Sequence, residues 1–443
     1  MSEILKETSL EDKFITHFNE LESRINGESK SAFHDIRKEA LESFKTLGLP
    51  DKRNEEYKYT PVQRVLKKNF DFGVVGEQAT LSADEIRDNY IPGLKTNTLV
   101  FINGVFSEKH SEIISKDIII KDFNLALKEN KEDIETYLAK YADYKEDAFV
   151  ALNTALAENG SFIKLENNKV IEEPIALYFI NDAKSKEVHS QPRNLFIAGK
   201  SSQASFIEVF KTTGEQASFT NVVTEVVVNE NAHIDYFKIQ NNENTSYHVG
   251  TTHVWQDRSS YFAGYTFTLS GALVRNNLNI IIDGEGCESH MFGLYLLNGS
   301  THVDNHTAVD HRKPNSFSNE LYKGILEDQS HGVFNGKVYV RQIAQKTNAF
   351  QSNKNILLSN EAIINTKPQL EIWADDVKCS HGCTTGQLDE EALFYLQSRG
   401  VGKERARVLL LYAYAAEILE NIKLDPLKDY LEGLVSERLH KNF

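Results

Sequence analysis

Residues 221–240 read NVVTEVVVNENAHIDYFKIQ, and this stretch decides the fold class. It holds two runs of β-branched and aromatic residues, Asn221–Val228 and His233–Gln240, on either side of a polar turn. Neither run continues with a helical period, so both are predicted to be strands. Similar runs, separated by polar turns, fill the chain from about 160 to 375, and several recur after about 28 residues.

This β region has no crossover helix, which leaves a sandwich, a barrel or a β-solenoid open. The 19 asparagines between residues 221 and 365 favour the solenoid, because asparagine tolerates the left-handed backbone of tight corners. A sandwich of this size would more naturally divide into two domains of about 100 residues. The sequence therefore predicts a mainly β protein built on a solenoid.

Helical patterns flank the β region. Near the N-terminus, apolar residues recur at helical spacing up to a stop at Gly48 and Pro50. Further helices are predicted at Asp389–Gln397, Lys403–Ile422 and Pro426–Leu439. The predicted domains are an N-terminal helical and mixed domain (1–150), the β core (151–385) and a C-terminal helical domain (386–443).

The chain of 443 residues carries 49 basic and 64 acidic side chains, a net charge of −15. We expect no binding to nucleic acid or to an anionic membrane through bulk electrostatics. The longest unbroken apolar run, Val408–Ala416, is too short to cross a bilayer, and the first residues contain no recognisable export signal. Three cysteines are too few for a disulfide framework, so we expect a cytoplasmic protein.

No nucleotide-binding motif is complete. The segment Gly332–Lys337 is one residue shorter than a P-loop, and Val338 stands where a magnesium-binding hydroxyl is needed. Dinucleotide-binding, zinc-protease, serine-hydrolase and calcium-loop motifs are also missing from the sequence. If the function of this protein requires ATP, we expect the ATP to bind to another chain.

His302, Asp304 and His306 alternate along one predicted strand, so their side chains should emerge on the same face. Imidazole and carboxylate groups together suit a borderline transition metal. The same residues can instead form a hydrogen-bonded polar ladder on the surface of the solenoid. We expect the surface ladder, without tight metal binding by the isolated chain.

The densest group of reactive side chains lies within Trp373–Gly386, where two carboxylates, two thiols and an imidazole fall between Asp375 and Cys383. In an extended stretch Cys379, His381 and Cys383 share a face, and thiolate with imidazole suits zinc or iron. The alternative is a turn that closes the last coil, with both thiols as small apolar filler. One such half-site offers too few ligands for a closed metal centre.

Residues 368–388, PQLEIWADDVKCSHGCTTGQL, closely resemble the SufB/SufD family of iron–sulfur cluster assembly proteins, as do ALFYLQSRG at 392–400 and the segments 334–338 and 349–359. The resemblance is strong over about 160–425. Asn54–Pro61, NEEYKYTP, is similar to the SufD branch, although Trp is commoner there than Tyr57. The length and the lack of an N-terminal Cys-x-x-Cys also favour that branch.

The resemblance implies a right-handed parallel β-helix between helical ends. It also implies a non-catalytic scaffold subunit that joins a SufB-like subunit and the SufC-like ABC ATPase, helps to build nascent clusters and takes part in receiving iron. The cluster or iron would be held transiently and shared with the partner, and this chain would bind no nucleotide.

The family's functional Cys-x-His pair falls on Cys379 and His381, near the expected SufB interface. Cys383 matches no family role and is expected to be structural. An incomplete ligand set suits a scaffold, because a cluster held by too many strong ligands could not be passed on.

The helix predicted at Lys403–Ile422 is expected to dock the ATPase. Leu410, Tyr414 and Ile418 form a second apolar row beside its main apolar face, and a short C-terminal domain has little to cover that row. The alternative is that the last predicted helix folds back over it. The resemblance favours docking, because the C-terminal helices are where such proteins are expected to hold SufC.

Two other classes of function stay open at this stage. β-Solenoids also occur in enzymes that cleave polysaccharides with paired carboxylates. A third possibility is an interaction module that binds no metal. The exposed edge of a solenoid further predicts that the isolated chain pairs with a second copy.

Overall fold

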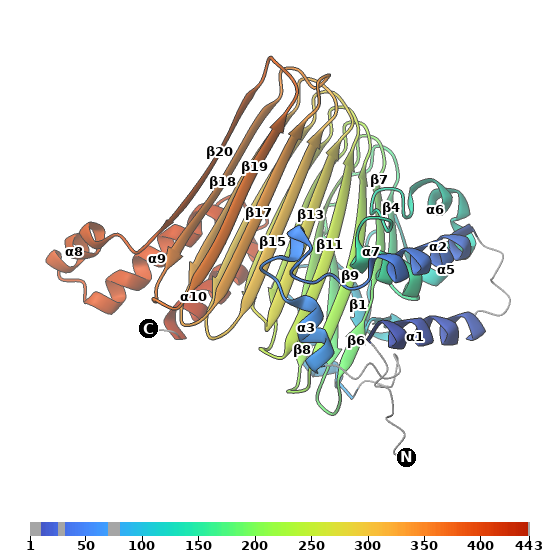
Figure 1. Ribbon diagram of the computed structural model, residues 1–443, viewed down its shortest axis with the longest axis horizontal. Coiled ribbons are helices and arrows are strands. Elements are labelled where there is room, and N and C mark those ends of the chain that lie inside the picture. Colours follow the sequence, from blue (N-terminus) through green and yellow to red (C-terminus); the bar gives the residue numbers. More distant parts are fainter. Residues whose placement is uncertain (1–9, 25–31, 70–79, 442–443) are drawn as a thin grey trace.

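The computed structural model describes residues 10–24, 32–69 and 80–441, which form a long β-helix with helices at both ends (Figure 1). The helices are α1 (Leu10–Arg24), α2 (Ala32–Leu47), α3 (Val62–Asn69), α4 (Ala83–Arg87), α5 (Phe123–Glu129), α6 (Lys131–Tyr137), α7 (Ala148–Leu156), α8 (Glu390–Ser398), α9 (Lys403–Leu419) and α10 (Asp425–Lys441), with short 3-10 helices η1 (Glu55–Tyr57) and η2 (Glu108–His110). Within these described ranges, no helix has the length and apolar character that a membrane span requires.

The strands form two sheets, and from β7 to β20 they alternate between them. They are β1 (Asn97–Ile102), β2 (Val105–Phe106), β3 (Ile118–Asp122), β4 (Ser161–Leu165), β5 (Ile175–Asp182), β6 (Val188–Ser190), β7 (Arg193–Ala198), β8 (Gln203–Thr213), β9 (Ser218–Val228), β10 (His233–Asn241), β11 (Ser246–Gln256), β12 (Tyr261–Ser270), β13 (Leu273–Ile282), β14 (Glu288–Leu297), β15 (His302–His311), β16 (Phe317–Leu326), β17 (His331–Val340), β18 (Asn348–Leu357), β19 (Ile363–Ile372) and β20 (Lys378–Gly386). Sheet A runs β2-β1-β5-β8-β10-β12-β14-β16-β18-β20. Sheet B runs β19-β17-β15-β13-β11-β9-β7-β4-β3.

From β7 onward each strand pairs in parallel with the strand one coil away. The pairing stacks equivalent residues into rows, and one row of sheet A recurs every 27 to 31 residues, close to the interval of about 28 that the sequence indicates. We name it the His381 row; it comprises Tyr236, Gly264, Met291, Glu320, Gln351 and His381.

Left-handed residues form the corners between strands. Asn231 and Asn315 have φ angles of 58° and 61°. The backbone N–H of Asn231 donates to the backbone carbonyl of Arg258 in the next coil. These two are the only asparagines between 221 and 365 with positive φ. Others lie inside the solenoid, where Asn276 donates to Asn305 across neighbouring strands. Asparagine therefore serves two of the left-handed corners, as its tolerance of that backbone predicts, and other asparagines bond between the coils.

Each sheet is covered on its outer face by a different end of the chain. Phe44 of α2 shares an apolar cluster with Phe219 of sheet B, together with residues of α1 and α7. Leu411 of α9 shares another cluster with Phe292 of sheet A, together with residues of α10. The predicted mainly β solenoid between helical ends is confirmed. The domain boundaries at 151 and 386 stay predictions; β1, β2 and β3 precede the first of them yet join the two sheets.

The C-terminal end of the solenoid is open. β19 and β20 end their sheets, and no described strand pairs beyond either (Figure 1). Ile363, the first residue of β19, is 53% exposed, and Trp373, the residue after the end of β19, is 49% exposed. Pro368, which has no backbone N–H to donate, lies in β19, as is typical of an edge strand. The last coil thus presents unpaired strand edges.

Candidate functional site

Cys379, His381 and Cys383 all lie on β20, in the open last coil. They pair in register with Ala349, Gln351 and Asn353 of β18, whose side chains are buried in the solenoid. Side chains of neighbouring strands in register point to the same face, so the three residues of β20 line the interior side of sheet A. Since β20 ends the sheet, that side opens to solvent, and His381 and Cys383 are exposed.

Cys379 is the most protected of the three. It is half-buried and packs against an apolar cluster that includes Val338, Ala349 and Ala374. Burial raises the pKa of the Cys379 thiol above its usual value. Burial thus disfavours the thiolate, and a metal that binds Cys379 would displace the thiol proton to a base or to water.

The last coil supplies only part of a ligand set. Residues two apart on a strand have Cα atoms roughly 7 Å apart, so Cys379 and His381 are neighbours on one face. Across the described residues, no three His, Cys, Asp or Glu side chains come together in a way that could hold a metal ion. A cluster bound here would need further ligands from outside the described chain.

A polar path leads inward from His381 along its row. Gln351 is 3% exposed and donates from Nε2 to Oε2 of Glu320, at 2.7 Å. Glu320 is 1% exposed, and its burial raises the pKa of the carboxyl group to about 7. No sequence motif marks Glu320. The coil interval of about 28 residues, together with the alternation of side chains along each strand, is the signal that places it in the His381 row.

The ladder of His302, Asp304 and His306 lies on one face of β15, as expected, but it is not on the surface. Residues 54–60, which we name the N-terminal strap, lie over it and contact all three of its side chains. The Thr60 hydroxyl lies 3.0 Å from His302 Nε2 and donates to Asp304 at 2.5 Å. Arg275 donates to the same Asp304 oxygen at 2.6 Å. Burial alone would raise the pKa of Asp304, but Arg275 and His306 outweigh it and hold that pKa well below its usual range.

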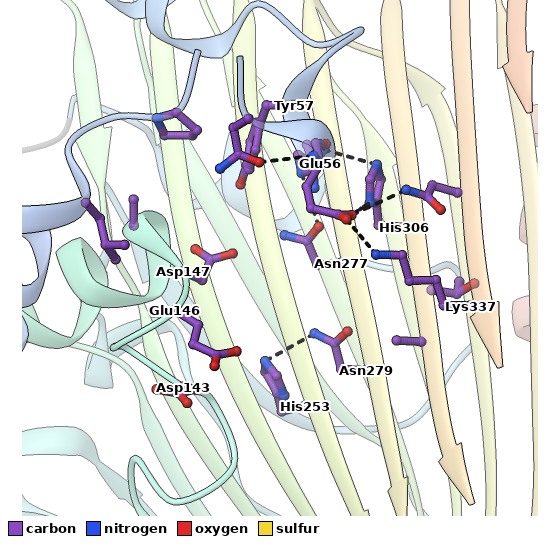
Figure 2. A pocket seen from close by; sticks show the side chains of 18 of the residues that line it. Glu56, Tyr57, Asp143, Glu146, Asp147, His253, Asn277, Asn279, His306 and Lys337 are labelled. Atoms are coloured by element: carbon purple, nitrogen blue, oxygen red, sulfur yellow. Dashed lines mark hydrogen bonds and ion pairs between the residues drawn. The ribbon is translucent and has the colours of Figure 1, made fainter. Parts of the chain in front are cut away.

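The strap also brings together two segments that carried the family resemblance. Glu56, from Asn54–Pro61, lies between His306 at 3.2 Å and Lys337 at 2.5 Å, and Lys337 belongs to the 334–338 segment. His306 and then Lys337 lower the pKa of Glu56 to about 2 (Figure 2). This part of the resemblance therefore contributes contacts that hold the N-terminal region on sheet B. The incomplete P-loop also lies within β17, an extended strand and not a loop.

A polar cavity of about 350 Å³ lies between the strap, the segment before α7 and sheet B. Asp143, Glu146 and Asp147 line one wall, and His253 faces them from the sheet with its Nε2 3.2 Å from the Asn279 amide (Figure 2). The cavity is on the outer side of sheet B, whereas Cys379 faces the interior side of sheet A. The two sites are therefore separate.

The second apolar row of α9 is covered by this chain. Ile418 is fully buried, and Tyr414 is half-buried with its ring 4.0 Å from the Lys323 ammonium of β16. The expectation of an open row is wrong for these two residues, because α9 lies on sheet A and not away from it. Leu410 is half-buried, while Leu409 beside it is 45% exposed. The docking role predicted for Leu410, Tyr414 and Ile418 stays a prediction.

Comparison with known proteins adds to this geometry. Residues 179–414 match the family model "SUF system FeS cluster assembly, SufBD core domain", and residues 8–177 match "SufBD protein N-terminal region". An iron–sulfur cluster assembly SufBD family protein of Synechocystis is 32% identical over 94% of this chain and 93% of its own length. The iron–sulfur cluster assembly protein SufD of Escherichia coli is 28% identical over 90% of this chain and 91% of its own length. The chloroplastic protein ABCI7 of Arabidopsis thaliana is 26% identical over 97% of this chain and 92% of its own length. The chain therefore belongs to the SufB/SufD family of the SUF iron–sulfur cluster assembly system.

Proposed function

We propose that this chain is a non-catalytic scaffold subunit of SUF iron–sulfur cluster assembly, from the SufD branch of the family. The pair of Cys379 and His381 on the open last coil carries the proposal, because it offers two ligands and leaves the rest of the set to a partner. The likeness to SufD of Escherichia coli, over nine-tenths of both chains, supports the branch.

The cargo is a nascent cluster or iron, bound for a short time. Cys379 loses its proton as it binds, and the cargo stabilises the thiolate that burial disfavours. His381 supplies a neutral imidazole nitrogen from the exposed side of the same strand. With only two ligands on this chain, the cargo leaves when the partner's ligands withdraw.

Two kinds of partner fit the two exposed regions at this end of the molecule. A SufB-like subunit would pair with the free edges of β19 and β20 and complete the ligand set. A SufC-like ATPase would dock on the C-terminal helices, at Leu410 and at three exposed apolar side chains of α8 and α9, Leu409, Phe394 and Tyr395. ATP would be bound by that partner and not by this chain.

The test is anaerobic co-expression with SufB-like and SufC-like partners, followed by iron and sulfide analysis of the purified complex. His381→Ala and Cys379→Ser should both lower the iron and sulfide content while the complex still forms. Cys383→Ser is the matched control, since Cys383 is an exposed thiol on the same face of the same strand. Unchanged iron and sulfide in the His381→Ala complex would contradict a ligand role.

The same experiment separates the other two functions considered. A metal-free interaction module would form the complex without iron or sulfide in any variant. A polysaccharide-cleaving enzyme would need paired carboxylates in an open groove. Of the carboxylates that line the cavity on sheet B, Glu56 is engaged with His306 and Lys337. A cytoplasmic location is part of this proposal, and it rests on the three unpaired cysteines.

A further inference from the structure

Glu320 differs from the other buried carboxylates of the described residues. Six carboxylate side chains are buried there: Asp182, Glu208, Glu225, Asp304, Asp310 and Glu320. In the first five, each oxygen has at least one hydrogen-bond donor or ion-pair partner. Glu320 has only neutral partners, the Gln351 amide on Oε2 and the Thr307 hydroxyl of the facing sheet. No cation of the described chain faces it in an ion pair.

An uncompensated buried carboxylate is costly for a fold. Taking an ionised carboxylate out of water costs several kcal/mol unless a positive charge or several donors replace the water. A structural role would be served as well by glutamine or by an apolar residue. Glu320 has two neutral donors and no counter-charge, so a positive charge beside its carboxyl group would be stabilised.

The neighbouring Gln351 has an oxygen without a hydrogen-bond partner. Gln351 uses its amide nitrogen for Glu320, and the oxygen without a partner is Oε1. Gly336 of the opposite sheet makes room for this amide, since a Cβ at Gly336 would fall 2.2 Å from the Gln351 nitrogen. Carboxylate and amide oxygens are ligands that hard and borderline divalent cations accept.

The two side chains are connected to the open end of the solenoid. Glu320, Gln351 and His381 are consecutive members of one row, on β16, β18 and β20. Neighbouring strands are about 4.8 Å apart, so Glu320 lies roughly 10 Å inward from the strand of the exposed His381. His381 is therefore the member of this row that a cation from solvent reaches first.

We propose that Glu320 and Gln351 form an inner binding station for a divalent cation, which His381 admits from the open end of the solenoid. The inference rests on the proposed function, which makes ferrous iron the cation concerned. The station holds the ion weakly, because it offers one carboxylate and one amide and no three His, Cys, Asp or Glu side chains in the described chain surround a metal. Iron would thus wait beside Cys379 and His381 before a cluster is built.

The test is an anaerobic titration of the full isolated chain with Fe²⁺, and with Mn²⁺ as a paramagnetic probe followed by electron paramagnetic resonance. Wild type should bind about one ion weakly, and Glu320→Gln should weaken that binding at least about tenfold, which corresponds to 1.4 kcal/mol. Glu327→Gln is the matched control, because this half-buried glutamate of the neighbouring turn already has Arg407 at 3.4 Å. It should bind as wild type does.

If Glu320→Gln perturbs folding, Gln351→Glu provides a second test of the inner station. A second carboxylate at the station should tighten binding of Mn²⁺ and Fe²⁺, a gain that a damaged fold would not give. Equal affinity of wild type and Glu320→Gln, or no binding by wild type, would overturn the inner station. Neither result bears on the cluster content of the His381→Ala complex, so the inner station and the proposed function can fail separately.

Discussion

At the scale of single residues, the protonation of Glu320 should be visible in the stability of the whole fold. Its folded pKa of about 7 lies above the ordinary value of 4.5. Below pH 4.5 both states are protonated. Between pH 4.5 and 7 the unfolded chain releases a proton that the folded chain keeps, so stability falls as the pH rises, by up to about 3 kcal/mol. Glu320→Gln should remove this loss, as measured by urea denaturation at pH 5 and pH 8.

Glu215→Gln, at an exposed glutamate, is the control and should keep the wild-type dependence on pH. An identical decline between pH 5 and pH 8 in Glu320→Gln would mean that Glu320 is not the responsible group.

Loss of the Asp304 carboxylate should strongly destabilise sheet B. Asp304→Asn leaves the buried Arg275 guanidinium without its counter-charge, which costs about 3–5 kcal/mol of unfolding free energy. Thr60→Ala removes only a hydroxyl from the same carboxylate and should cost about 1 kcal/mol. Denaturant titration measures both. Similar effects of the two substitutions would show that the Arg275 charge is satisfied elsewhere.

Sequence patterns predict which residues share a strand face, but not what lies over that face. The alternation of His302, Asp304 and His306 is visible in the sequence, and the structure has all three on one side of β15. The strap that covers them is separated from them by more than 240 residues along the chain. The spacing of residues within one strand carries no information on a contact with a distant segment. It therefore predicts a ladder on the surface.

At the scale of elements, the exposed apolar side chains of α8 and α9 are the place to test ATPase docking. Leu409→Glu puts a charge on a side chain that is 45% exposed, so it should weaken binding of the SufC-like ATPase without lowering the melting temperature. Ile418→Glu buries a charge in the cluster with sheet A and should lower the melting temperature instead. Calorimetric titration and thermal melts measure these effects. Full ATPase affinity of the Leu409→Glu variant would place the docking surface elsewhere.

The C-terminal helices are largely predictable from the sequence, and their packing is not. The predicted helices at Asp389–Gln397 and Lys403–Ile422 lie close to α8 and α9. The apolar rows of α9 indicate two covered sides, but they do not say which neighbour covers each. Lys323 contributes to the cover of Tyr414 with its ammonium over the ring, and a lysine in a strand gives no apolar signal.

At the scale of the whole molecule, the free strand edges predict self-association of the isolated chain. Ile363→Lys places a charge on the exposed edge strand β19, and it should reduce any dimer without changing thermal stability. Sedimentation velocity over a range of concentrations measures the effect. A dimer of unchanged strength would show that two copies meet through another surface.

The solenoid as a whole follows from its repeat, because a coil of 27 to 31 residues is regular enough to be seen in the turn spacing. The open end does not follow in this way. Cys379 and His381 were identified through a resemblance, since two ligands on an edge strand are too few to indicate a metal site by spacing alone. The sequence alone does not show that Gln351 and Glu320 lie behind His381 in the interior of the solenoid.

The stacking of coils also makes stability uneven along the molecule. An interior coil is hydrogen-bonded on both sides, whereas β20 is bonded only to β18, and most of its residues are exposed. Backbone amides in such a strand exchange with solvent through local opening that leaves the rest of the fold intact. The two proposed ligands, Cys379 and His381, therefore lie on the coil that we expect to fray first. A partner strand added at this edge would slow the fraying and complete the ligand set in one step, so that firm binding of the cargo is tied to the presence of the assembled complex.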